Sequence, residues 1–184
     1  MRQVLKLHPD SRCGAAIQIE VEIARPRVDR LALSYIVTGK IDDIRMPPLA
    51  APARSEKLWQ QTCFEAFVRA STGDEYYEFN FSPSTQWAAY RFSGYRSEMR
   101  LADEIDAPEI EVRFDPHRFT LSAALALERL SVLPRKAAWR LGLSALIEDK
   151  SGDKSYWALA HPPGKPDFHH ADCFAYEFLA DGRS

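Results

Sequence analysis

The chain has 184 residues, of which 46% are hydrophobic and 27% are charged, so its composition is typical of a folded globular protein. The formal net charge of -2 gives no support for nucleic-acid binding, and no stretch reaches the roughly 18 uninterrupted apolar residues of a membrane span. We therefore expect one domain over residues 1–184 that binds no nucleic acid and enters no membrane.

The N-terminal segment does not have the pattern of a signal peptide. Residues 8–10 are His-Pro-Asp, where an apolar run would be required. We therefore expect a cytoplasmic protein, provided that no leader has been removed. The three cysteines, Cys13, Cys63 and Cys173, are too widely spaced for a disulfide framework or a paired-cysteine zinc motif, and we expect free thiols.

Motif spacing excludes several classes of enzyme. No two of the eight glycines lie within five residues of each other, so both the dinucleotide-binding fingerprint and the phosphate-binding P-loop are absent. The sequence also contains no GxSxG and no HExxH motif. We predict a protein that is not an enzyme and that uses no cofactor.

Alternation of apolar and polar residues predicts strands from residue 15 onwards. Segment Ala15–Arg25 has an apolar residue at every second position from 17 to 23, and residues 31–37 repeat this pattern. The prolines of residues 46–54 cannot serve a sheet ladder, so this stretch is predicted to be a loop.

Three hairpins follow, each with two strand-like runs around turn residues. They pair Cys63–Ala70 with Tyr76–Ser82, Glu109–Phe114 with Phe119–Leu127, and Leu141–Glu148 with Ser155–His161. A last strand is predicted over Cys173–Leu179. Residues 121–133 could also form a helix, but we favour a strand because the run begins at a turn. The sequence thus predicts an all-β, antiparallel β-sandwich.

Alternation also predicts which side chains share a face. If the apolar rows form the core, then Glu65, Glu78 and Asn80 come together on an outer sheet face. Two carboxylates and a carboxamide beside aromatic rings are suited to binding the hydroxyl groups of a polyol. The alternative is a set of solvated strand residues, or a polar network satisfied internally.

A second group surrounds the aromatic run of residues 87–92. Trp87 and Arg91 share one row of this strand, and such a row offers ring stacking together with charged hydrogen bonds. Arg96 follows shortly after, and Trp59 lies at a loop–strand junction beside the polar strands. The alternative is that the row belongs to the core, which is also where we place Trp139.

A third group begins at Trp157 and continues into a proline-rich loop that presents His161, Asp167, His169 and His170. The histidines and nearby aspartates could ligate a metal, but their spacing matches no zinc pattern, so none is predicted. A His–Asp pair could serve acid–base catalysis, but no nucleophile accompanies it. The loop could equally close one end of the sandwich.

Three stretches resemble the DOMON-like, type 9 carbohydrate-binding modules, in particular the small bacterial stand-alone branch. They are residues 58–67 (LWQQTCFEAF), residues 77–84 (YEFNFSPS) with 87–90 (WAAY), and residues 155–159 (SYWAL) through 166–169 (PDFH). The resemblance covers most of residues 30–178. It implies a β-sandwich of jelly-roll type with a ligand face, which in the wider superfamily holds sugar or haem.

Two features depart from that resemblance. The secreted modules carry export signals, whereas the N-terminal segment here does not have that pattern. The haem-binding relatives use Met and His as iron ligands, whereas the internal methionines here are only Met46 and Met99. We therefore predict a non-catalytic domain that binds a carbohydrate or a sugar-like metabolite. The alternatives are a domain for haem or for a protein partner, and an enzyme that uses the His/Asp loop. The predicted ligand-binding residues are Trp59, Glu65, Glu78, Asn80, Trp87, Arg91, Arg96, Trp157, His161, Asp167, His169 and His170.

Overall fold

The computed structural model describes residues 1–27, 29–130, 133 and 138–179. The strands in this part of the chain are β1 (Arg2–Leu7), β2 (Ala16–Arg27), β3 (Arg30–Gly39), β4 (Cys63–Ala70), β5 (Tyr76–Phe81), β6 (Trp87–Phe92), β7 (Arg100–Leu101), β8 (Glu109–Asp115), β9 (Arg118–Ala126), β10 (Trp139–Glu148), β11 (Lys154–Ala158) and β12 (Tyr176–Phe178). The 3-10 helices are η1 (Ile41–Asp43), η2 (Leu58–Gln60) and η3 (Ala171–Cys173). Within these residues, no helix is long and apolar enough to cross a membrane.

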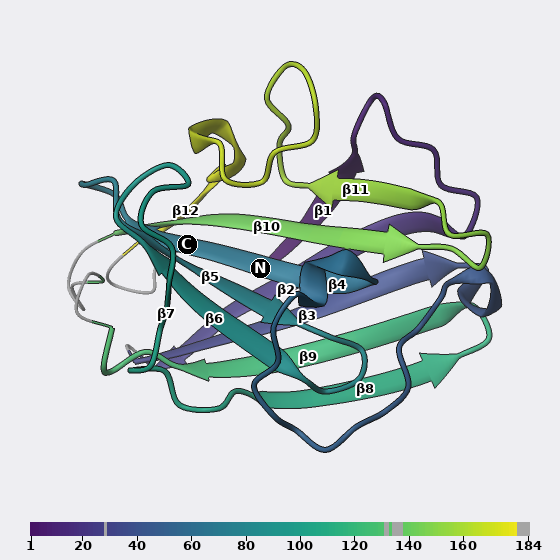
Figure 1. Ribbon diagram of the computed structural model, residues 1–184, viewed down its shortest axis with the longest axis horizontal. Helices are drawn as coiled ribbons and strands as arrows, with labels where there is room; N and C mark the ends of the chain where they lie inside the picture. Colours follow the sequence, from purple (N-terminus) through teal and green to yellow (C-terminus); the bar gives the residue numbers. More distant parts are fainter. Residues whose placement is uncertain (28, 131–132, 134–137, 180–184) are drawn as a thin grey trace.

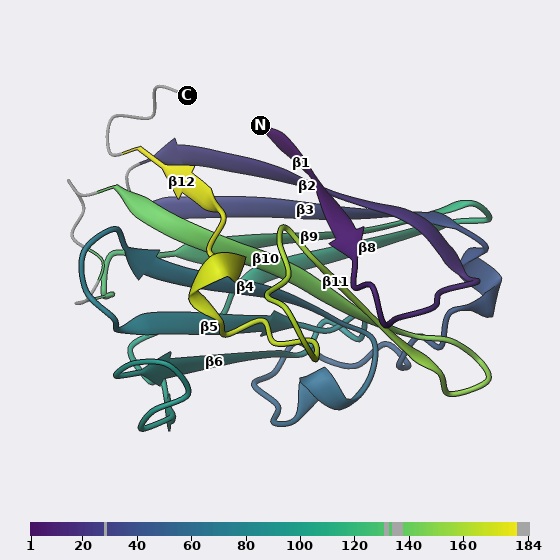
Figure 2. The same ribbon diagram turned by 90° about the horizontal axis from the view of Figure 1, so that it is seen from above.

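The strands form two layers (Figures 1 and 2). One layer has the order β7-β6-β5-β4-β10-β11, and the other has the order β1-β2-β3-β9-β8. Strand β1 pairs with both β11 and β2, so it links the layers, and β12 pairs with β10. All of these strands pair with antiparallel neighbours. The predicted all-β, antiparallel β-sandwich is confirmed.

The three predicted hairpins are present as β4–β5, β8–β9 and β10–β11. Residues 118–126 form a strand, as favoured over a helix, whereas residues 131 and 132 of that alternative lie outside the described residues. Three strands differ from the prediction, among them the two-residue β7, which was not predicted. Strand β1 was not predicted, because Leu5 is its only fully buried residue. The last strand is shorter than predicted, because η3 ends at Cys173 and the strand begins only at Tyr176.

The main core lies between the two layers and is built from the inward rows of their strands. Phe64 of β4 packs against Phe119 of β9, with ring centroids 5.7 Å apart. Tyr35 of β3 is fully buried, and its hydroxyl donates a 2.7 Å hydrogen bond to the backbone carbonyl of Glu65. The outward-pointing side chain of Glu65 is therefore carried by a backbone that the core holds in place.

Three of the four tryptophans belong to this core. Trp139 is buried, as predicted, and the guanidinium of Arg25 lies 3.8 Å from its ring centroid. Trp87 and Trp157 are each only 5% exposed, and the Trp157 indole donates a hydrogen bond to the Ser155 hydroxyl. The prediction that Trp87 and Trp157 lie on the ligand face is therefore wrong.

Strand β6 explains the error at Trp87. The row that contains Trp87 and Arg91 faces the core, whereas Tyr90 and Phe92 face outward. Arg91, next to the end of the strand, forms an ion pair with Glu75 at 3.0 Å. Because both rows of β6 are largely apolar, alternation alone does not tell which row is buried between the layers.

Candidate functional site

The outer face of the layer that contains β4 and β5 is partly covered by three connections. They are residues 45–62, residues 93–99 and residues 159–175. A second apolar cluster packs on this face, apart from the main core. Its buried members are Phe67, Tyr76, Ala88, Tyr90, Phe92, Ala158, Phe168 and Phe174, with Leu58, Trp59 and Tyr156 packed against them.

A pocket of about 500 Å³ lies between this face and the connections. Its volume is within the usual range for a small-molecule site. The pocket is lined by Trp59, Glu65, Glu78, Phe92, Arg96, Met99, Leu146, Tyr156, Pro166, Phe168 and His169. It therefore combines aromatic and aliphatic walls with a small number of charged or polar groups.

Glu65, Glu78 and Asn80 lie together on the outer face, as the alternation predicted. The register pairs Glu65 with Asn80 and Phe67 with Glu78, so the two glutamates are diagonal neighbours. Glu65 is 4% exposed and Glu78 is 6% exposed. The Asn80 amide donates to Glu78 Oε1 at 2.7 Å, and the Ser144 hydroxyl donates to Glu65 Oε2 at 3.2 Å.

Burial changes the acidity of both glutamates. Removal from water, together with the negative charge of Glu78, raises the pKa of Glu65 to about 8. Removal from water also raises the pKa of Glu78 to about 7, although its hydrogen bond from Asn80 acts in the opposite direction. Two carboxylates so close in a poorly solvated site resist full ionisation. The pair therefore retains protons near neutral pH.

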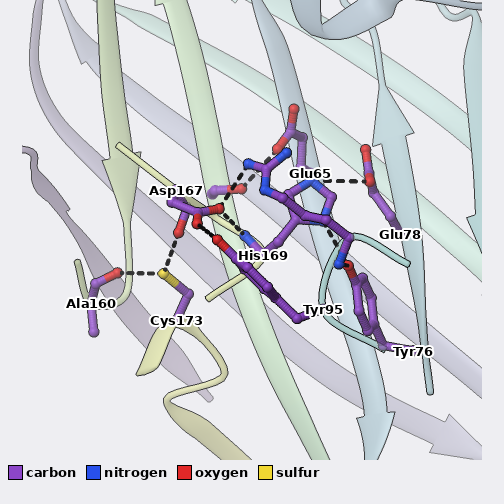
Figure 3. A network of polar contacts seen from close by, with 10 residues as sticks. Glu65, Tyr76, Glu78, Tyr95, Ala160, Asp167, His169 and Cys173 are labelled. Atoms are coloured by element: carbon purple, nitrogen blue, oxygen red, sulfur yellow. Dashed lines mark hydrogen bonds and ion pairs between the residues drawn. The ribbon is translucent and has the colours of Figure 1, made fainter. Parts of the chain in front are cut away.

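His169 reaches this face from the connection between β11 and β12 (Figure 3). Its Nδ1 lies 2.8 Å from the Tyr76 hydroxyl, and its Nε2 lies 3.6 Å from Glu78 Oε2. The rings of Phe67 and Phe92 pack against it, each with centroids 5.1 Å away. Burial lowers the pKa of His169 to about 4, so at neutral pH the imidazole adds no positive charge beside the carboxyl groups.

Three residues join two of the covering connections, and we call them the rim clasp: Tyr95, Arg96 and Asp167. The Tyr95 hydroxyl donates to Asp167 Oδ2 (Figure 3). The Arg96 guanidinium donates to Asp167 Oδ1 at 2.8 Å. The backbone N–H of Arg96 donates to the Tyr76 hydroxyl at 3.2 Å. Arg96 has a φ of 52°, a left-handed conformation that few non-glycine residues adopt. These contacts hold the Arg96 side chain at the pocket.

Most of the predicted ligand-binding residues are brought together at or beside the pocket. Asn80 is hydrogen-bonded to Glu78, and Asp167 is hydrogen-bonded to Arg96, so each lies directly behind a residue that lines the pocket. Asp167 and His170 also line an adjoining hollow beside Tyr95. The predicted residues that line the pocket itself are Trp59, Glu65, Glu78, Arg96 and His169.

His161 does not line the pocket, and neither do Trp87, Arg91 and Trp157. Its Nε2 is 2.8 Å from the backbone oxygen of Lys6, and its ring packs edge-on against His8 with centroids 4.8 Å apart. Its ring also contacts the ring of Phe168, which lines the pocket, with centroids 6.5 Å apart. His161 is one residue removed from the pocket because β11 ends at Ala158 and the chain then passes alongside β1. Throughout the described residues, no three His, Cys, Asp or Glu side chains are grouped to hold a metal ion.

Several pocket residues were not predicted from the sequence. Tyr156 and Leu146 lie opposite each other on β11 and β10, so alternation in their hairpin could have placed them on the outer face. Met99 and Phe168 come from connections, where no periodicity indicates a direction. Tyr76 lies in the same row of β5 as Glu78, but its role in holding His169 and Arg96 depends on contacts between distant segments.

No protein-family model and no curated protein sequence matches this chain. Solved structures do match it. A proposed carbohydrate-binding protein from Bacteroides uniformis has a TM-score of 0.68 at 13% identity, covering 94% of this chain and 83% of its own. A family 9 carbohydrate-binding module from Caldicellulosiruptor kristjanssonii in complex with glucose has a TM-score of 0.54 at 14% identity, covering 95% and 81%. Such a module in complex with cellotriose has a TM-score of 0.50 at 12% identity, covering 89% and 74%. This chain therefore has the fold of the family 9 carbohydrate-binding modules.

Proposed function

We propose that this protein binds a carbohydrate in the pocket on its outer sheet face and does so without catalysis. The observation that carries the proposal is the pocket of about 500 Å³ in which two buried carboxyl groups face aromatic walls. Buried carboxyl groups carry a desolvation cost, so their presence on a pocket floor favours a ligand that forms hydrogen bonds with them.

The pocket offers the two kinds of contact that a sugar ring requires. Trp59 and Tyr156 are only partly buried and supply aromatic surface for the apolar C–H face of a pyranose. Glu65, Glu78 and Arg96 supply acceptors and donors for its hydroxyl groups. The modules that share this fold, one with glucose and one with cellotriose, add support for a sugar ligand.

Haem, the other ligand of the wider superfamily, does not fit the residues present. Met99 and His169 both line the pocket, and methionine and histidine can ligate haem iron. However, His169 Nδ1 is bonded to Tyr76 and its Nε2 faces Glu78, so neither nitrogen is directed at an open position. A floor with two carboxyl groups is also a poor surface for an apolar macrocycle.

Isothermal titration calorimetry with glucose, galactose, mannose and cellotriose tests the proposal. We expect at least one of these sugars to bind the native chain and to lose at least about tenfold in affinity with Trp59→Ala. The matched control is Phe114→Ala, which removes a half-exposed aromatic ring from β8 in the other layer. Equal affinity of the native chain and Trp59→Ala for every sugar that binds would contradict this site. If none of these sugars and no amino sugar binds, the proposed carbohydrate-binding function is contradicted.

A further inference from the structure

We propose that the sugar held in this pocket carries a protonated amino group, which binds between Glu65 and Glu78. This inference rests on the proposed function and specifies its ligand class. Both side chains are more than nine-tenths buried, and both line the pocket. They lie as diagonal neighbours on paired strands, so a single small cation can approach both carboxyl groups.

The hydrogen bonds around the pair leave acceptor capacity toward the pocket. Ser144 donates only to Glu65 Oε2, and Asn80 donates only to Glu78 Oε1. Within the described part of the chain, no group donates a hydrogen bond to Glu65 Oε1. A carboxylate has about four lone-pair sites, so each glutamate can accept further donors. An ammonium group has three N–H donors and no acceptor, which matches this arrangement.

The charged groups around the pair do not balance it. Arg96, from the β6–β7 connection, is the cation that lines the pocket, and its guanidinium is already bonded to Asp167. His169, from the β11–β12 connection, is uncharged at neutral pH. The raised pKa values of Cys63, Tyr76 and Tyr90 leave these groups uncharged at neutral pH. The other charged groups in the outer rows of β4 and β10 do not line the pocket: Arg69 packs over the ring of Phe174, Arg140 lies opposite Arg69, and Glu148 is paired with Arg45. At the pocket itself, full ionisation of Glu65, Glu78 and Asp167 would thus place three negative charges against the guanidinium of Arg96.

A neutral hydroxyl group cannot remove that imbalance, whereas an ammonium group can. Charge-assisted hydrogen bonds are roughly twice as strong as neutral ones, and a buried carboxylate without a cation is costly. Without ligand, burial keeps protons on the pair and raises the pKa values of Glu65 and Glu78 to about 8 and about 7, with the charge of Glu78 adding to the effect at Glu65. A bound ammonium takes the place of a proton, so its binding must release protons into the solvent.

Calorimetry at pH 6.5 with matched sugar pairs tests this inference. The probes are glucosamine with glucose, galactosamine with galactose, and mannosamine with mannose, with N-acetylglucosamine as an uncharged amide. Each titration is repeated in two buffers of different ionisation enthalpy, which measures the protons released. We expect at least one amino sugar to bind at least about tenfold more tightly than its neutral partner and to release on the order of one proton.

The double substitution Glu65→Gln with Glu78→Gln keeps the shape of the floor but removes its charge. We expect it to abolish both the preference for the amine and the proton release, while its unfolding transition shows that it still folds. Glu148→Gln is the matched control, because Glu148 is a buried carboxylate on β10 that is paired with Arg45 and does not line the pocket. It should retain both properties.

The outcomes separate the two proposals. Neutral sugars that bind as tightly as their amino partners would overturn the amine inference and leave the proposed function in place. Amine binding without proton release, or amine preference that persists in the double variant, would also overturn the inference. Failure of every sugar and amino sugar to bind would overturn both.

Discussion

The two faces of a single layer differ sharply in this protein. On the inner face, the rows of β4 and β5 contribute only apolar or aromatic side chains, which pack in the main core. The alternate positions of the same strands point to the outer face, where Glu65, Glu78 and Asn80 lie at or beside the pocket. Because side chains alternate with a period of two, one backbone serves both purposes. The inner face stabilises the fold, and the outer face carries groups whose burial is costly.

The largest expected effect is a difference in the free energy of unfolding between two variants, one with a tryptophan of the inner face replaced and one with a tryptophan of the outer face replaced. Trp87→Ala should lower the free energy of unfolding by about 3–5 kcal/mol, because it leaves a cavity between the layers. Trp59→Ala, at the partly exposed pocket wall, should cost less than about half as much. Urea denaturation of both variants measures the difference. Equal losses would show that the outer wall is as much a part of the stabilising core as the inner face.

The same comparison explains how far the sequence could predict the site. In β4 and β5 the polar residues fall on one row, so alternation correctly placed Glu65 and Glu78 on the outer face. In β6 both rows are apolar apart from Arg91, and the aromatic content of the Trp87 row led to the wrong face. Periodicity predicts a face only when one of the two rows is clearly polar.

Contacts between connections could not be predicted in this way. Arg96 and Asp167 are 71 residues apart in the chain, and their ion pair depends on how two irregular segments pass over the sheet. The same is true of His169, which reaches Tyr76 across 93 residues. Local patterns identified these polar residues as candidates, but the fold brought them together and left His161 outside the pocket lining.

The next largest effect is a pH dependence of stability that originates on the outer face. The folded-state pKa values of Glu65 and Glu78, about 8 and about 7, exceed the ordinary value of 4.5. The native state therefore binds more protons than the unfolded state, and the free energy of unfolding falls as pH rises through this range. Between pH 6.5 and 8 the native chain should lose on the order of 1–2 kcal/mol from this source.

Thermal or urea unfolding at several pH values checks this expectation. His169 has the opposite tendency, because its pKa is lowered to about 4, and most of its contribution changes below its ordinary value of 6.5. The carboxyl groups therefore dominate the change in stability above pH 6.5. The double substitution Glu65→Gln with Glu78→Gln should remove the decline, whereas Glu148→Gln should keep it. A decline of the same size in the double variant would assign it to other groups.

A smaller effect is expected at Tyr76, whose hydroxyl joins the pocket floor to its cover. Tyr76→Phe removes the contacts with His169 Nδ1 and with the backbone N–H of Arg96. We expect a loss of about 1 kcal/mol in the free energy of unfolding. Ligand binding should also weaken, because His169 and Arg96 both line the pocket. The control is Tyr176→Phe, which removes a hydroxyl that is bonded to the Met1 sulfur outside the pocket and should leave ligand binding unchanged. If Tyr76→Phe affected stability alone, its hydroxyl would have no part in positioning the pocket residues.

The smallest effect on stability, and the clearest division between stability and binding, is expected from the rim clasp. Asp167→Asn weakens the bonds that Asp167 accepts from Arg96 and Tyr95, on a surface where Arg96 is half exposed. Because exposed ion pairs contribute little, the free energy of unfolding should change by less than about 1 kcal/mol.

Ligand affinity should nevertheless fall several-fold with Asp167→Asn, because the guanidinium of Arg96 is no longer held at the pocket and must be ordered on binding. Asp106→Asn is the matched control, since it makes the same change in an exposed ion pair with Arg129 that lies outside the pocket. Calorimetry and urea unfolding of the two variants measure binding and stability separately. Equal affinity in both would mean that the pocket works without the clasp, and that the buried floor of Glu65 and Glu78 is sufficient for recognition.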